Sequence, residues 1–165
     1  METIIPKNFE YFERATPNEM EKLIKQQGDD VCHNVIGVDY IKNNLKTYDY
    51  GFIRISPKAT IGRMRTRQNT HQLNSFILCR LIPDPLIKII DIILVCSRPN
   101  SKDGKQLLEL AEIKAKELGY QRLSLIAVGN KRLMTWYVSQ GYVVESDKHI
   151  LETKTYVYSM KKNIV

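Results

Sequence analysis

The sequence predicts a single α/β domain, residues 1–165, built on a mixed β-sheet. Apolar residues recur at helical spacing in some segments and alternate with polar residues in others, which indicates interspersed helices and strands. Turn residues separate these segments, and no repeat, low-complexity tract or interdomain linker divides the chain. A chain of 165 residues with 43% apolar content is long enough for one domain with a substantial core.

The first half of the chain predicts strands that flank a pair of helices. Thr16 and Pro17 suit a helix start, because threonine caps free backbone N–H groups and proline fits the first turn. Gly28 is expected to end that helix. Residues 38–47 place apolar side chains on one helical face. Residues 57–73 are polar and basic, which fits either a long loop or a short helix.

The second half predicts a hairpin followed by alternating helices and strands. Two apolar strands join at a turn at 83–85, and the next helix carries an apolar stripe that ends at Gly119. The strand after Gly119 should run parallel to the strand before that helix, because strand–helix–strand crossovers are right-handed. The expected elements are strand 9–14, helices 16–27 and 38–47, strands 50–56, 76–82 and 87–97, helix 107–118, strand 123–128, helix 131–140, and strands 142–145 and 153–160.

One segment after the crossover carries a constellation that points to function. The residues that carry it are Asn130, Leu133, Tyr137, Gly141 and Tyr142, at offsets of 0, 3, 7, 11 and 12. In this strand–helix–strand context they resemble the second half of the acyl-CoA-binding core in the GNAT superfamily of N-acyltransferases. The resemblance extends over most of the chain, because β-α-α-β-β-β-α-β-α-β-β is the element order of that fold.

The resemblance implies a particular cofactor site. In GNAT proteins two central parallel strands splay apart, and the pantetheine arm of acyl-CoA lies in the cleft between them, bonded to exposed backbone groups. By this resemblance Leu94 and Val95 lie beside the arm, and Asn130 hydrogen-bonds the arm or caps the following helix. Tyr137 corresponds to the general acid that returns a proton to the departing thiolate. The alternative role of Tyr137 is packing against the crossover helix.

The loop before the crossover helix departs from the family pattern. GNAT proteins place glycine, one residue, then glycine or alanine here, because backbone N–H groups and the positive helix end bind the CoA diphosphate. Lys102 occupies the first glycine position and Gly104 the second, while Pro99 stands where a basic residue is usual. The loop is either an ordinary strand–helix turn or a variant phosphate site. In the second interpretation Asp103 and Lys105 also line it, and the two lysines add positive charge.

Asp91 is a second candidate catalytic residue. It interrupts a strand rich in isoleucine and leucine, where a charge is costly unless it is paired or faces a cleft. Its position, four residues before Val95, matches the place of a catalytic glutamate in many GNAT proteins. An amine with a pKa near ~10.4 is protonated at neutral pH, so a carboxylate that accepts this proton would serve as general base. The alternative is a structural or edge carboxylate.

Basic residues are concentrated in one part of the chain. The net charge is +7, and residues 50–83 contain no Asp or Glu. Arg54 and Arg80 are expected to point to solvent or a cleft, and Arg63, Arg65 and Arg67 to lie on an insertion. This stretch is either a solvated loop or a positive surface for an acidic acceptor, an acidic partner, or the cofactor phosphates. Nucleic acid is less favoured, because no aromatic residues interleave the arginines.

Cysteine usage and the N-terminus favour a cytoplasmic, unanchored protein. Cys79 and Cys96 lie in apolar runs and are interpreted as buried thiols, which suits a reducing compartment. The N-terminus lacks the pattern of a signal peptide, and no apolar run is long enough to span a membrane. The histidines are isolated, so no metal site is expected.

The sequence therefore predicts an acyl-CoA-dependent N-acetyltransferase that uses acetyl-CoA as co-substrate. An amine acceptor would attack the thioester directly in a ternary complex. Whether this acceptor also carries acidic groups is left open. The strand-end N–H near Val95 would stabilise the oxyanion. Two alternatives remain: a CoA-binding sensor or scaffold with weak turnover, and a module for nucleic acid or an acidic partner built around residues 54–80. The chain would act as a monomer or a homodimer.

Overall fold

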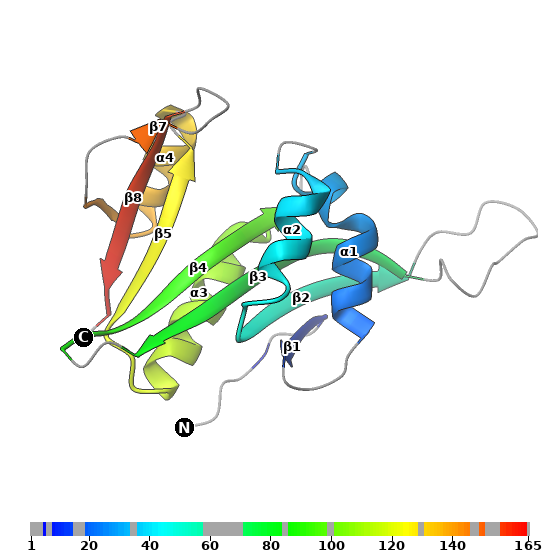
Figure 1. Ribbon diagram of the computed structural model, residues 1–165, viewed down its shortest axis with the longest axis horizontal. Coiled ribbons are helices and arrows are strands. Elements are labelled where there is room, and N and C mark those ends of the chain that lie inside the picture. Colours follow the sequence, from blue (N-terminus) through cyan, green and yellow to red (C-terminus); the bar gives the residue numbers. More distant parts are fainter. Residues whose placement is uncertain are drawn as a thin grey trace, which may run out of the picture.

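The computed structural model describes residues 5, 8–14, 19–33, 36–57, 71–83, 86–98, 101–128, 131–145, 149–150 and 156–164. In these residues one mixed sheet carries helices on both faces (Figure 1). The element order confirms the expected α/β class, with one further two-residue strand near the C-terminus. The elements are β1 (Phe9–Glu13), α1 (Glu19–Val31), α2 (Val38–Asn44), β2 (Tyr50–Pro57), β3 (His71–Pro83), β4 (Lys88–Ser97), α3 (Gly104–Glu117), β5 (Arg122–Val128), α4 (Lys131–Ser139), β6 (Val143–Val144), β7 (His149–Ile150) and β8 (Tyr156–Asn163).

The sheet has the strand order β1-β2-β3-β4-β5-β8-β6, and β7 also pairs with β8. β1 to β4 pair antiparallel in the order of the sequence, and α1 and α2 lie in the connection from β1 to β2. β5 then pairs with β4 in parallel through the α3 crossover, as the sequence predicted. The C-terminal strands close the sheet in antiparallel pairing. Two central strands, β4 and β5, therefore meet in parallel in the middle of an otherwise antiparallel sheet.

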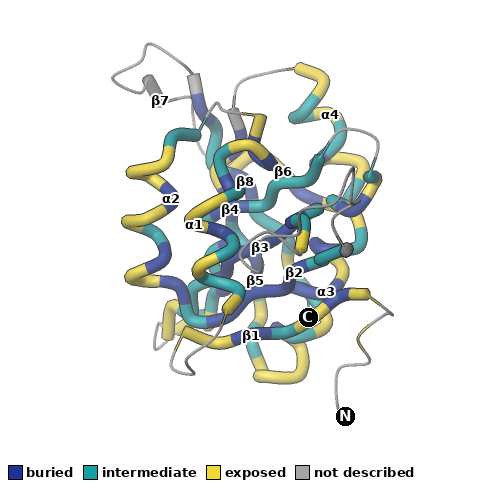
Figure 2. Tube along the Cα trace, turned by 90° about the vertical axis from the view of Figure 1, so that its right-hand side faces the viewer, coloured by how far each residue is buried: buried dark blue, intermediate teal, exposed yellow. Residues whose placement is uncertain are grey.

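Two apolar clusters hold the layers together. The first joins α3 and α4 to one face of the sheet, and the second joins α1 and α2 to the other face over β1–β4. Figure 2 shows the strands as mostly buried tube between helices whose outer sides are exposed. The apolar stripe of α3 supplies the first cluster with Leu107, Leu108, Leu110, Ala111 and Ala115.

The first helix does not end at Gly28, as the sequence had indicated, but continues to Val31. The glycine lies where α1 crosses α2. A Cβ added there would lie 3.2 Å from Cγ2 of Ile24 and 3.4 Å from Cδ1 of Ile41. The missing side chain thus permits close helix packing, rather than a left-handed helix end.

Candidate functional site

The two parallel strands β4 and β5 separate after a short paired stretch. Their register runs from Ile89 opposite Arg122 to Ile92 opposite Leu125, and no further pair follows in the described residues. The other edge of β4 stays paired with β3 as far as Ser97. Figure 1 shows the two strands diverging from their common start. Backbone groups along the inner edge of β4 beyond Ile92 are therefore free to bond an extended ligand, as an added strand would.

A bulge in β4 lies at the start of this gap. Ile92 pairs with Cys79 and Leu94 with Leu78, so Ile93 is the extra residue. A bulge turns the following side chains and backbone groups. Leu94 consequently packs into the α1–α2 cluster, and Val95 packs against the α3–α4 cluster. Their side chains are used in packing, so a ligand in the gap would meet these two residues through their backbone.

The loop that leads into α3 contains a left-handed backbone conformation, which glycine would favour, at a position that is occupied by a lysine. Lys102 has a φ of 57°, in the left-handed region. That conformation costs an L-residue about 1–2 kcal/mol. Gly104 begins α3, and no side chain caps the helix start at Asp103. The first N–H groups of α3 have no partner within the helix, which is the arrangement that favours an anion.

The carboxylate of Asp103 is already occupied. Its Oδ2 atom lies 2.6 Å from Nε of Arg54, and the side chain of Asp103 is only 8% exposed. Arg54, which was expected to point to solvent or a cleft, is the counterion of this carboxylate, and its side chain is 26% exposed. Any contact of Asp103 with a cofactor would therefore come from its backbone.

Two further features of this loop concern Ser101 and Gly104. Oγ of Ser101 is buried and has no hydrogen-bond partner among the described residues. A Cβ at Gly104 would lie 3.2 Å from Cη2 of Trp136, so α4 approaches the start of α3 closely. The unpaired hydroxyl and the free N–H groups suit a diphosphate, whereas the missing side chain at Gly104 lets α4 pack closely against the start of α3. Lys102 and Lys105 lie in the same turn with their side chains exposed.

Tyr137 lies in the short helix α4 and is buried. Its ring centroid lies 5.0 Å from that of Trp136 and 6.0 Å from that of Tyr142, both edge to face. Burial raises the pKa of Tyr137 to about 12, because a phenolate would lose its hydration. The phenol therefore holds its proton throughout the neutral range. Asn130, the other half of the sequence constellation, falls outside the described residues.

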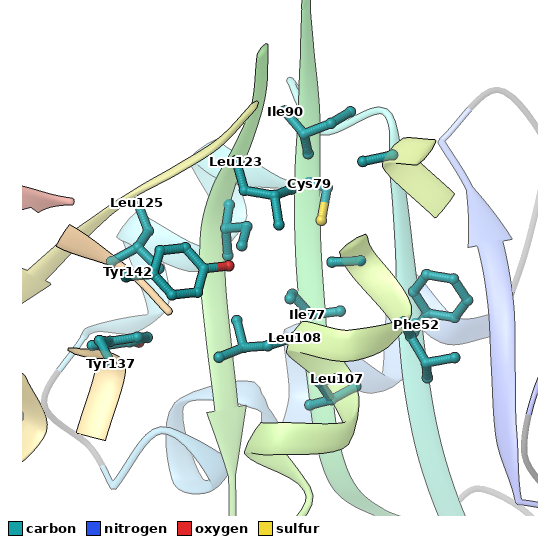
Figure 3. Packing of buried hydrophobic residues seen from close by; sticks show 14 of the residues in the cluster. Phe52, Ile77, Cys79, Ile90, Leu107, Leu108, Leu123, Leu125, Tyr137 and Tyr142 are labelled. Carbon is teal, nitrogen blue, oxygen red and sulfur yellow. The ribbon is translucent and has the colours of Figure 1, made fainter. Parts of the chain in front are cut away.

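Tyr142 belongs to the sequence constellation, but the sequence did not indicate that its hydroxyl group would be buried. Its hydroxyl is buried without a hydrogen-bond partner in the described part of the chain. Figure 3 shows this hydroxyl pointing toward β4, on the α3 side of the sheet, with Tyr137 nearby. Burial and the neighbouring Cys79 thiol raise its pKa. Its spacing from Gly141 was the available signal, because an aromatic residue after a helix-ending glycine with a φ of 96° returns toward the core.

Asp91 lies beside the apex of the gap, opposite Ser124 and one residue before the last β4–β5 pair. Oδ2 lies 2.9 Å from Nη2 of Arg80, and Oδ1 accepts a hydrogen bond of 3.3 Å from Oγ of Ser124. The carboxylate of Asp91, which interrupts an apolar strand in the sequence, is thus paired with Arg80. The side chain of Asp91 is 23% exposed. Arg80 forms an ion pair, rather than standing as a free cation. Asp91 does not lie with Tyr137 on one face: neighbouring Ile90 and Ile92 pack toward α3, so Asp91 faces away from it.

Comparison with solved structures places this architecture. The chain is similar to a protein in the crystal structure of the NatC complex bound to Gag peptide and CoA, with a TM-score of 0.67 and 10% identity over 96% of this chain and 99% of that one. It is also similar to an acyl-CoA N-acyltransferase from Pseudomonas aeruginosa (TM-score 0.65, 18% identity, 93% and 98% covered). A third similar structure is a GNAT family acetyltransferase from Elizabethkingia anophelis with acetyl-CoA bound. Its TM-score is 0.60 and its sequence identity 12%, over 96% of this chain and 99% of that one.

The chain has the GNAT fold. No protein-family model matches it, and no curated protein sequence does. The GNAT resemblance drawn from the spacing of Asn130, Tyr137 and Gly141 is thereby confirmed at the level of the fold.

A disulfide bond ties the end of α1 to β4. Cys32, after the end of α1, is bonded to Cys96 near the end of β4, with a Cα–Cα distance of 5.0 Å. The interpretation of Cys96 as a buried thiol is wrong, whereas Cys79 is a free, buried thiol. The two partners are 64 residues apart, so spacing along the chain gave no signal of the bond. The inference of a reducing compartment loses its basis.

Arg98 reinforces this connection. Its Nη1 atom lies 2.5 Å from Oδ2 of Asp30, and Nε donates to the carbonyl of Leu73 at 2.6 Å. Nε2 of His33 lies 3.2 Å from the carbonyl oxygen of Ser97. The end of α1 is therefore fixed to the strand end that leads into the loop before α3. Arg98 is used in this connection and not as a phosphate ligand.

The remaining basic cluster, Arg63, Arg65 and Arg67, lies outside the described residues. Within those residues no group of three or more histidine, cysteine or acidic side chains is placed to hold a metal ion. No helix of the described chain is both long and apolar enough to cross a membrane.

Proposed function

We propose that this protein is an N-acetyltransferase that transfers an acetyl group from acetyl-CoA to an amine. The observation that carries the proposal is the separation of β4 and β5 after Ile92, directly beside the uncapped start of α3. The gap offers backbone partners for an amide-bearing arm, and the helix start offers N–H groups for a diphosphate. In acetyl-CoA the amide-bearing pantetheine arm is joined directly to the diphosphate, so the two binding features lie next to each other as the ligand requires. The solved structures with CoA or acetyl-CoA bound to the same fold support this assignment.

The residues of the site supply a complete transfer. Asp91 would take a proton from the acceptor ammonium on the open side of the sheet. The amine nitrogen would form a bond to the acetyl carbonyl carbon, the bond between carbon and sulfur would break, and the nitrogen would release its second proton to water to leave the neutral amide. The backbone N–H near Val95 would stabilise the oxyanion, and Tyr137 would return a proton to the thiolate. Leu94, Gly104 and the loop residues Lys102, Asp103 and Lys105 would hold the co-substrate, and Asn130 would complete the site.

The sole tryptophan of the chain makes binding measurable apart from turnover. Because Trp136 lies against Gly104, its fluorescence should change when acetyl-CoA binds the loop. The decisive experiment combines this titration with transfer from labelled acetyl-CoA to a panel of small amines, peptides and basic proteins. Saturable binding with transfer to at least one amine is expected. Absence of binding at millimolar acetyl-CoA would refute the proposal.

A CoA-binding sensor with weak turnover is the second candidate. Two observations favour it: Lys102 stands in the position of a glycine, and Asp91 is engaged by Arg80 and Ser124. Saturable binding without transfer to any amine would select it. The module for nucleic acid is less favoured, because Arg54 and Arg80 are both neutralised by carboxylates.

A further inference from the structure

A row of charged and polar side chains crosses the sheet beside the apex of the β4–β5 gap. Arg80 of β3 is paired with Asp91 of β4, Asp91 with Ser124 of β5, and Ser124 with Lys161 of β8. Directly paired residues carry their side chains on the same face of a sheet. These four residues, here called the charged row, therefore form one continuous line across four strands.

The charged row lies on the face that no described helix covers at β5 and β8. Residues next to the row, such as Ile90, Leu123 and Met160, belong to the cluster under α3 and α4, so the row faces the opposite way. The cluster beneath α1 and α2 draws its strand residues only from β1 to β4 among those described. Figure 1 shows α1 and α2 over that part of the sheet and away from β5 and β8. Ile126, on the same face, is 66% exposed.

This face carries more positive than negative charge. Arg80 is paired with Asp91, but Glu145 alone faces two cations, at 3.8 Å from Nη1 of Arg122 and 3.9 Å from Nζ of Lys161. Three cations thus meet two carboxylates. The contact of Lys161 with Glu145 is longer than a hydrogen bond, so the ammonium of Lys161 can still bind an anion. Its side chain is 27% exposed.

We infer that the acceptor is a small amine that carries its own anionic group, such as a free amino acid. The inference rests on the proposed function. The acceptor ammonium would meet Asp91, and its carboxylate or phosphate would meet Lys161. Neighbouring strands lie about 4.8 Å apart, so the backbones of these residues are separated by about 10 Å, and the long lysine side chain can shorten this span. An amine without an anion would place its ammonium near Lys161, whose charge is only partly balanced because Glu145 is shared with Arg122, and like charges repel.

The inference is tested with acceptors that differ only in charge. Carboxylates of increasing length, namely glycine, β-alanine and 4-aminobutyrate, are compared with their amides in the labelled transfer assay. For the best carboxylate the KM should be roughly 10- to 100-fold lower than for its amide, the usual worth of a charge-assisted hydrogen bond. Lys161→Met should bring the ratio of the two KM values near one, and Lys161→Arg should restore it. Lys116→Met, on an exposed lysine of α3, should leave the ratio unchanged.

The outcomes separate this inference from the proposed function. Transfer to amides and carboxylates with equal KM would overturn the inference while the acetyltransferase assignment stands. An unchanged ratio in Lys161→Met would overturn the role of Lys161. Transfer only to peptides without an acidic group would also overturn the inference. Absence of both Trp136 fluorescence change and transfer would remove the proposed function, and the inference with it.

Discussion

Burial widens the pH range over which Tyr137 keeps its proton, although a phenol is protonated at neutral pH in any case. Its pKa of about 12 keeps the phenol protonated, which a proton donor requires before it acts. The ring packs edge to face against Trp136 and Tyr142. A protonated donor at this position would serve the departing thiolate, whereas a tyrosine used only for packing would need no hydroxyl.

Tyr137→Phe removes the hydroxyl and keeps the ring. We expect kcat to fall by roughly 10²–10⁴-fold, the usual contribution of a positioned acid, with little change in the Kd of acetyl-CoA. Steady-state kinetics and the Trp136 titration measure the two quantities. Tyr120→Phe, a half-buried tyrosine after α3, is the matched control and should keep full activity. Undiminished kcat in Tyr137→Phe would assign this residue to packing.

Gly104, at the start of α3, lies close to the ring of Trp136 in α4. Gly104→Val would place a branched side chain against Trp136, where even a Cβ lies only 3.2 Å away. We expect acetyl-CoA no longer to raise the melting temperature of this variant. In the parent, ligand at a hundred times its Kd should stabilise the fold by about 2.7 kcal/mol.

The matched control is Gln106→Val, which adds the same side chain two residues further along α3. It should retain the ligand-dependent rise, measured by thermal unfolding with and without acetyl-CoA. If Gly104→Val keeps the full rise, the start of α3 does not hold the diphosphate.

At the scale of elements, α1 and β4 are joined more firmly than helix packing requires. The Cys32–Cys96 bond closes a loop across 64 residues. In the chain-entropy description a loop of this length stabilises the fold by about 4 kcal/mol. The double variant Cys32→Ser, Cys96→Ser should lose about this much unfolding free energy in urea, and the parent in a dithiol reductant should match it. Equal stability of the oxidised and reduced parent would show that the bond does not form in solution.

The elements themselves were predicted well where the pattern is local. The α3–β5–α4 segment follows from an apolar stripe, a glycine turn and a continuous apolar strand, and its bounds agree within a few residues. Gly28 was misinterpreted because its reason lies in α2, which a local pattern does not contain. The β3 strand starts five residues earlier than predicted, at His71, because its first residues alternate only weakly in hydrophobicity.

The candidate site was predicted less completely than the fold, for the same physical reason. The roles of Arg54 and Arg80 depend on carboxylates 49 and 11 residues away, so their charges looked free in the sequence. The disulfide depends on a contact between α1 and β4 that only the assembled sheet creates. Lys102 was recognised as a departure, but that it adopts the left-handed turn is a property of the folded loop.

At the scale of the whole molecule, the core contains a thiol and several phenol groups that burial keeps protonated. Burial raises the pKa of the Cys79 thiol to about 12, and it also raises the pKa values of Tyr50 and Tyr142. These groups keep their protons in the folded state at a pH where the unfolded chain releases them. The unfolded state then binds fewer protons, so stability falls as pH rises.

We therefore expect the unfolding free energy to be constant near pH 7, to fall from about pH 9, and to keep falling toward pH 12. Urea unfolding at a series of pH values measures this. Cys79→Ala should delay the onset of the fall, because the thiol ionises first in the unfolded chain. An unfolding free energy that stays constant up to pH 11 would contradict the claim that these buried groups stay protonated in the folded state.

The bond between Cys32 and Cys96 also has a consequence for the amide hydrogens of α1. With its last turn fixed to β4, this helix cannot fray at that end without disturbing the sheet. Slow hydrogen exchange in residues 28–31 should then report global unfolding while the bond is intact, and local opening once it is reduced. The same amides would thus show two opening free energies in one protein, one with the disulfide oxidised and a lower one with it reduced.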